Sequence, residues 1–129
     1  MKVAYIVETE KSVANALAAL QAAIAKNQYG VMHIHDLRAT LQKKGHDLGT
    51  DCHVLEVCNP RQAVNVLRED ISMNMALPCR ISVYQEGGKT KIGTILPTTI
   101  LGMMSDSPAL GGVAGQVEQD LKRIIDEAK

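Results

Sequence analysis

The chain has 129 residues, 46% of them hydrophobic, and its 14 basic residues balance its 14 acidic residues, which gives a formal net charge of zero. This composition suits a single packed domain over residues 1–129 and argues against a disordered chain. A balanced charge and the absence of Phe and Trp disfavour nucleic-acid partners, which are bound by basic patches and aromatic stacking platforms.

The first half of the chain alternates predicted strands and helices. Short β-branched apolar runs are typical of strands, and apolar residues recurring every three or four positions are typical of helices. Ser12, Asp36 and the Asn59-Pro60 pair are residue types that begin helices. The predicted elements are strands at Val3–Glu8, Val31–His35 and His53–Cys58, and helices carrying Val13 to Ile24, spanning Leu37–Lys44, and running from Pro60 to near Asp70.

The second half contains the strongest topological signal, a Gly87-Gly88 turn between two apolar runs. A tight glycine turn between two such runs predicts an antiparallel hairpin. We predict its strands at Cys79–Gln85 and Lys89–Leu96, a connector before it, a loop with one helical turn at Thr98–Gly112, and a last helix from about Val113 to Ala128.

The predicted order is therefore β-α-β-α-β-α-β-β-α. Because the hairpin is antiparallel, a uniformly parallel sheet is disfavoured, and we expect an α+β fold whose mostly antiparallel sheet carries helices on one face. The other face must then be solvated or covered by a second subunit, so a homodimer is the expected assembly.

The three cysteines form an odd number, and no apolar run reaches the length of a signal peptide core or of a membrane span, which needs about 20 residues. We therefore expect a cytoplasmic protein with reduced thiols and no membrane partner.

Cys58 and Cys79 are the first chemical candidates. Cys58 ends one predicted strand and Cys79 begins another, so antiparallel pairing of these strands would bring the two thiols together. Cys58 also precedes a predicted helix N-terminus, where a thiolate is favoured. The pair is either a reactive or metal-binding thiol pair or, as free cysteines often are, two small buried hydrophobes.

A second group lies on one predicted face of the sheet. Side chains alternate along a strand, so His33 and His35 share a face, and so do Glu56 and Cys58. Imidazole, carboxylate and thiolate are ligands of Zn²⁺, and His35, Cys58 and Cys79 are the predicted metal ligands. Neither the C-x-x-C nor the H-E-x-x-H spacing is present, and a polar sheet face that is solvated or buried in a dimer explains the same residues.

Three further groups have weaker patterns. Arg80 is expected either to pair with Glu56 or Glu86, or to hold an anionic ligand. The loop containing His46, Asp47, Asp51, Cys52 and His53 mixes metal-ligand types in a common loop composition, and the methionines Met73, Met75, Met103 and Met104 suit either core packing or an adaptable binding surface.

Two stretches together resemble a known family. The chain reads Leu55-Glu56-Val57-Cys58-Asn59-Pro60 and later Leu77-Pro78-Cys79-Arg80, and His35-Asp36-Leu37 also fits the pattern. This combination resembles the family of domains of unknown function numbered 302, over Val3 to Pro97. The resemblance implies a single α+β domain with a fold like that of the TATA-binding protein, without implying DNA binding. It implies no settled activity.

The sequence therefore favours a binding module with a metal or small-molecule site beside the sheet. The expected site comprises His35, Glu56, Cys58, Cys79 and Arg80, with zinc as the candidate cofactor. A thiol-dependent redox or metal-assisted enzyme and a homodimeric interaction domain without chemistry remain the alternatives.

Overall fold

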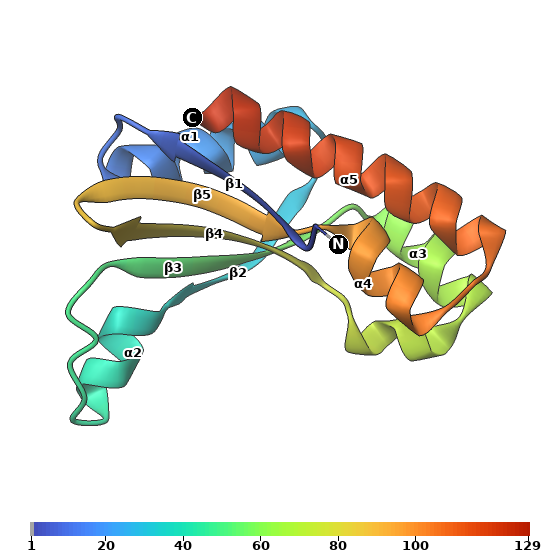
Figure 1. Cartoon of the computed structure of the whole chain (residues 1–129), viewed down its shortest axis with the longest axis horizontal. Helices are drawn as coiled ribbons and strands as arrows, with labels where there is room; N and C mark the ends of the chain where they lie inside the picture. Colours follow the sequence, from blue (N-terminus) through green and yellow to red (C-terminus); the bar gives the residue numbers. More distant parts are fainter. Residues whose placement is uncertain (1) are drawn as a thin grey trace.

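The computed structural model describes residues 2–129 and shows a five-stranded antiparallel sheet with helices packed against it (Figure 1). The strands are β1 (Ala4–Thr9), β2 (Gly30–Asp36), β3 (Cys52–Cys58), β4 (Cys79–Glu86) and β5 (Lys89–Ile95). The helices are α1 (Val13–Lys26), α2 (Leu37–Lys43), α3 (Pro60–Glu69), the 3₁₀ helix η1 (Ile71–Met75), α4 (Pro97–Met104) and α5 (Pro108–Ala128).

The strands are arranged in the order β1-β5-β4-β3-β2, and every neighbouring pair is antiparallel. The predicted fold class and element order are confirmed, including the hairpin of β4 and β5. Gly87 and Gly88, which form its turn, both have positive φ angles, a conformation that glycine adopts without steric cost.

The main core lies between one face of the sheet and the helices α1 and α5 (Figure 1). Alternate strand residues face it, because strand side chains have a period of two. Ser12 begins α1 as predicted, since its side chain accepts a hydrogen bond from the Asn15 N–H at 3.1 Å. The strands contribute Leu55, Val57, Ile81, Val83 and Ile92, and the helices contribute Leu20, Ile24, Leu121, Ile124 and Ile125 among others.

A second, smaller core lies beyond the end of the sheet, where α3, η1, α4 and the start of α5 meet. Its buried residues are Val66, Met73, Leu101, Leu110 and Ala114. Helix α5 is long enough, at 21 residues, to contribute side chains to both cores. The molecule therefore has two hydrophobic clusters that share one helix.

The segment Thr98–Gly112 differs from its prediction as a loop with one helical turn. Most of it is helical, because Pro97 is the first residue of α4 and Pro108 is the first residue of α5. Proline suits a first helical position, where its missing N–H costs nothing. Ser107 caps α5 by accepting a hydrogen bond from the Leu110 N–H. The Gly111-Gly112 pair therefore lies inside α5 and not at its N-terminus.

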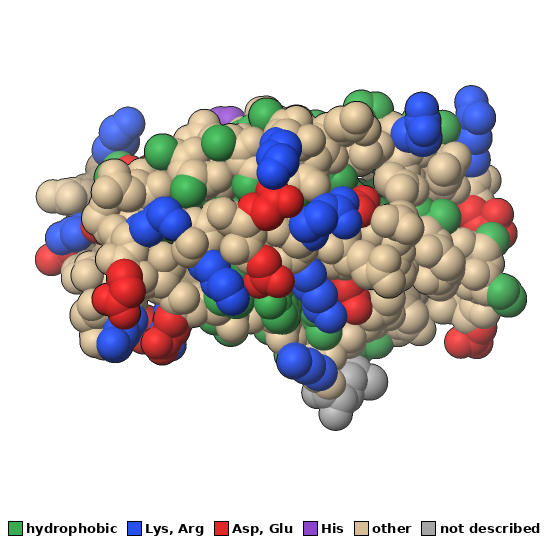
Figure 2. Space-filling view, turned by 90° about the horizontal axis from the view of Figure 1, so that it is seen from above, with side chains coloured by type: hydrophobic (Ala, Val, Ile, Leu, Met, Phe, Trp, Pro, Cys, Tyr) green, Lys and Arg blue, Asp and Glu red, His purple; other side chains and the backbone are tan. Residues whose placement is uncertain are grey.

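The outer surface over α1 and α5 carries interspersed Lys, Arg, Asp and Glu side chains (Figure 2). Neither sign gathers into a patch on the face in view, which agrees with the balanced charge of the chain. Among residues 2–129, no helix is both long and apolar enough to cross a bilayer.

The opposite face of the sheet exposes apolar side chains of its edge region, and the predicted second subunit would cover them. Ile6 on β1 and Ile95 on β5 are each 52% exposed.

We expect sedimentation equilibrium to give a dimer, and Ile6→Lys to give a monomer, because a buried lysine at this interface would lose its hydration. Ile71→Lys, at an exposed position on η1, is the control and should leave the mass unchanged. A wild-type monomer at all concentrations would contradict the dimer.

Candidate functional site

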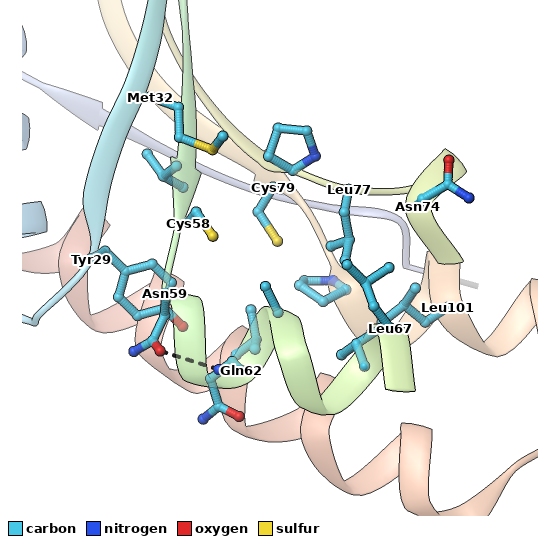
Figure 3. A pocket seen from close by; sticks show the side chains of 16 residues that line it. Tyr29, Met32, Cys58, Asn59, Gln62, Leu67, Asn74, Leu77, Cys79 and Leu101 are labelled. Atoms are coloured by element: carbon cyan, nitrogen blue, oxygen red, sulfur yellow. Dashed lines mark hydrogen bonds between the residues drawn. The ribbon is translucent and has the colours of Figure 1, made fainter. Parts of the chain in front are cut away.

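A pocket of about 260 Å³ opens at the end of the sheet, between the two hydrophobic cores (Figure 3). Its walls are largely apolar side chains from β3, α3, the segment before β4, α4 and α5. A few polar side chains join them, and the two cysteines of the predicted site are also present. The lining residues include Val57, Cys58, Ala63, Val66, Leu67, Leu77, Cys79, Leu101 and Val117, with Asn59, Gln62 and Asn74 as polar members.

The turn after β3 creates this pocket. Asn59 lies directly between the end of β3 and Pro60, and its side-chain carbonyl accepts a hydrogen bond from the Gln62 N–H at 3.2 Å. This cap begins α3 immediately after the strand, as the Asn-Pro pair predicts. The helix therefore lies beside the strand ends and supplies one wall, while Cys58 remains at the strand terminus.

The structure brings Cys58 and Cys79 together. Strands β3 and β4 pair antiparallel with Val57 opposite Cys79, so Cys58 is one residue beyond the partner of Cys79. Both thiols are free and both line the pocket, and their side chains point into it side by side (Figure 3).

Burial changes the chemistry of Cys79. Burial and, less strongly, the neighbouring Cys58 raise the pKa of the Cys79 thiol to about 11, because a thiolate is poorly solvated there and would be close to a second thiol. Cys79 is therefore a neutral thiol at pH 7. A nucleophilic cysteine requires the opposite shift, toward a lower pKa, so Cys79 is not an activated nucleophile.

The other predicted residues lie elsewhere, on the exposed face of the sheet. His35 Nε2 lies 3.3 Å from Glu56 Oε1, and an Arg80 nitrogen lies 3.7 Å from Glu56 Oε2. His33 contacts His35, with ring centroids 4.3 Å apart. The predicted pairing of Arg80 with Glu56 is thus present, and these four side chains form an ion-pair and ring cluster separate from the thiols.

The predicted zinc ligands are not assembled. His35 does not line the pocket that holds Cys58 and Cys79, and within residues 2–129 no three His, Cys, Asp or Glu side chains are grouped as a metal site. The physical reason is the sheet register: His35 is opposite Val54, near the other end of β3, whereas Cys58 is opposite Gly30.

The weaker candidates have structural roles. In the loop before β3, the Asp47 carboxylate accepts a hydrogen bond from the Gly49 N–H, and Asp51 pairs with Arg38 at 3.1 Å. Of the methionines, Met73 is fully buried in the smaller core, as the core-packing alternative predicts, whereas Met75 and Met103 are about three-quarters exposed.

Sequence reasoning missed several residues of the pocket, above all Tyr29 and Met32. Tyr29 is buried and its hydroxyl donates a hydrogen bond to Asp120 Oδ2 at 2.9 Å, and burial together with this contact raises the pKa of Tyr29 well above its ordinary value. Gln28 and Tyr29 precede a predicted strand in an unremarkable sequence context, and no local pattern indicates that Tyr29 lines a pocket with Cys58.

The comparisons with known proteins agree with this fold. The family described as "Domain of unknown function DUF302" matches residues 5–128, which extends the resemblance through the last helix. A solved structure described as an uncharacterized conserved protein DUF302 from Bacillus stearothermophilus is similar, with 36% sequence identity, a TM-score of 0.93 and 98% of each chain covered. Curated proteins give no match.

Proposed function

Because the chain belongs to the DUF302 family, whose description names no activity, we propose a function from its pocket: it is a binding module for a small ligand with an apolar body. The observation that carries this proposal is the 260 Å³ apolar pocket at the end of the sheet. Concave apolar pockets with a few polar groups are the usual form of small-molecule sites.

The size and lining of the pocket define the ligand. A water molecule occupies about 30 Å³ of liquid, so the volume has room for roughly ten non-hydrogen atoms. Leu67, Leu77 and Leu101 supply apolar contact, and the amides of Asn59 and Gln62 supply hydrogen bonds. A short alicyclic or branched aliphatic body with one uncharged polar group fits this description.

The affinity for such a ligand should be modest. At roughly 0.3–0.5 kcal/mol for each non-hydrogen atom, ten atoms give about 3–5 kcal/mol, and a Kd near the millimolar range. A natural ligand that also contacts the two thiols would bind more tightly.

The thiol pair also supports a second candidate, a thiol-dependent redox activity, because Cys58 and Cys79 face the same pocket. The raised pKa of Cys79 favours binding over this alternative, since thiol exchange proceeds through a thiolate. All three cysteines are free, which is typical of proteins in a reducing compartment, and we place the module in the cytoplasm on this ground.

The test is a titration with apolar fragments. The full chain, labelled at its methyl groups, is followed by NMR while cyclohexanol, indole or isoamyl alcohol is added. We expect shifts confined to methyl groups of the pocket, such as those of Leu67 and Leu101. Ala63→Phe should abolish them, because Ala63 lines the pocket and a benzyl group would fill it.

Val64→Phe is the matched control. Val64 is the next residue on the same helix, is 42% exposed and does not line the pocket, so this variant should retain binding. Shifts that persist unchanged in Ala63→Phe, or the absence of any pocket shift with the whole fragment panel, would contradict the proposed function.

A further inference from the structure

The pocket gathers three sulfur atoms from three neighbouring strands. Val57 on β3 pairs with Val31 on β2 and with Cys79 on β4. Cys58 follows Val57 directly, and Met32 follows Val31. Cys58 and Cys79 occupy neighbouring positions on adjacent strands, which are about 4.8 Å apart, and Met32 lies on the next strand. All three residues line the same pocket.

A β-bulge places Met32 in this group. The pairing of β2 with β3 shifts between Val31 and His33, so Met32 has no partner of its own in the ladder. Bulges redirect side chains and are frequent at functional sites. In the close view the Met32 side chain lies at the rim of the pocket, above the two cysteine side chains (Figure 3).

The three sulfur atoms are soft metal ligands, and three is a low coordination number. Two thiols and one thioether are soft ligands of the kind that bind Cu(I). Zn²⁺ instead takes four ligands from thiolate, imidazole and carboxylate. Within residues 2–129 no third His, Cys, Asp or Glu joins the two cysteines.

We propose that Met32, Cys58 and Cys79 bind one monovalent soft metal ion, of which Cu(I) is the biological example. The site is three-coordinate: two thiolate bonds and one thioether bond form, and the two thiol protons pass to solvent or buffer. No electron transfer is involved, because the ion arrives as Cu(I). The inference goes beyond the proposed function and does not depend on it.

The surroundings are mostly apolar. Val57, Leu77 and Pro78 line the pocket beside the two cysteines and offer no oxygen or nitrogen ligand from their side chains. Met32 is 62% exposed, which leaves a route by which a metal carried by a soluble complex can be transferred to the thiols.

The experiment is an anaerobic competition titration of the reduced full chain. Cu(I) is delivered as its bathocuproine disulfonate complex, whose visible absorbance falls as the protein removes the metal. We expect one Cu(I) per chain, a thiolate-to-copper charge-transfer band in the ultraviolet, and three sulfur neighbours by X-ray absorption spectroscopy.

Variants identify the ligands. Cys58→Ser and Cys79→Ala should each weaken binding by more than the roughly 10–100-fold that loss of an outer-shell partner costs. Met32→Leu should weaken it by at least roughly 10-fold on the same scale and reduce the sulfur count by one. Because Met32 is exposed, this variant tests the site without disturbing the core.

Cys52→Ser and Met103→Leu are the controls, since neither residue lines the pocket, and both should bind Cu(I) like the wild type. Retention of wild-type affinity in Met32→Leu or in the Cys58→Ser variant overturns the inference. So does a stoichiometry of one metal per two chains, or tighter binding of Zn²⁺ than of Cu(I). Fragment binding is measured without metal, so the two proposals succeed or fail separately.

Discussion

Replacing Ile92 with alanine is expected to lower the free energy of unfolding by about 3–4 kcal/mol, within the range found for large-to-small changes in a packed core. Ile92 is completely buried in the main core, on β5 between β1 and β4. The change removes apolar contacts and leaves a cavity that the surrounding strands cannot close, because their positions are fixed on both sides. Urea unfolding followed by far-ultraviolet circular dichroism measures the loss.

Ile71→Ala provides the control, at a position outside the sheet and outside the main core. Ile71 is 70% exposed, so its truncation should cost less than about 1 kcal/mol. Equal destabilisation by the two variants would show that the main core does not lie on the face of the sheet described above.

Cys79 should react with iodoacetamide about 100-fold more slowly in the folded protein than in urea. Its pKa is raised from 9.0 to about 11, so at pH 8 the thiolate fraction falls by two orders of magnitude, and the thiolate is the reacting form. The sign of the pH dependence follows: the rate should increase about tenfold per pH unit up to about pH 10. Mass spectrometry of digested protein reports each cysteine separately.

The urea-unfolded chain serves as the control, because its thiols have ordinary pKa values and no shielding. If Cys79 reacts equally fast in both states, or if its native rate is independent of pH between 7 and 9, the thiol is not held protonated by burial. Such a result would also favour the redox alternative over binding.

Local patterns predict most of the fold, because each element carries its own start and stop signals. The Gly87-Gly88 turn, the Ser12 cap and the Asn59-Pro60 pair act over a few residues, and the structure contains the hairpin and helices that they indicate. The helix α4, which the sequence analysis did not predict, follows the same rule, because Pro97 is its first residue and proline suits that position.

The candidate site could be predicted only in part. Cys58 ends β3, Cys79 begins β4, and the two strands pair antiparallel. The end of one strand then lies beside the start of the other, so the sequence is enough to predict that the two cysteines are close. The position of His35 depends on the register of β2 against β3, and the position of Met32 depends on a bulge. No short-range pattern encodes either one, because both result from packing along the whole strand pair.

The division of the apolar interior into two clusters joined by α5 has a consequence for local opening. The cluster formed by α3, η1 and α4 contains fewer buried residues than the cluster under the sheet. Its separation from the rest of the molecule therefore exposes less apolar surface and costs less free energy. Amide hydrogens of α3 and α4 should therefore exchange with solvent sooner than those of the central strands. The pocket lies between these two clusters. A bound ligand would therefore contact both of them and slow that exchange.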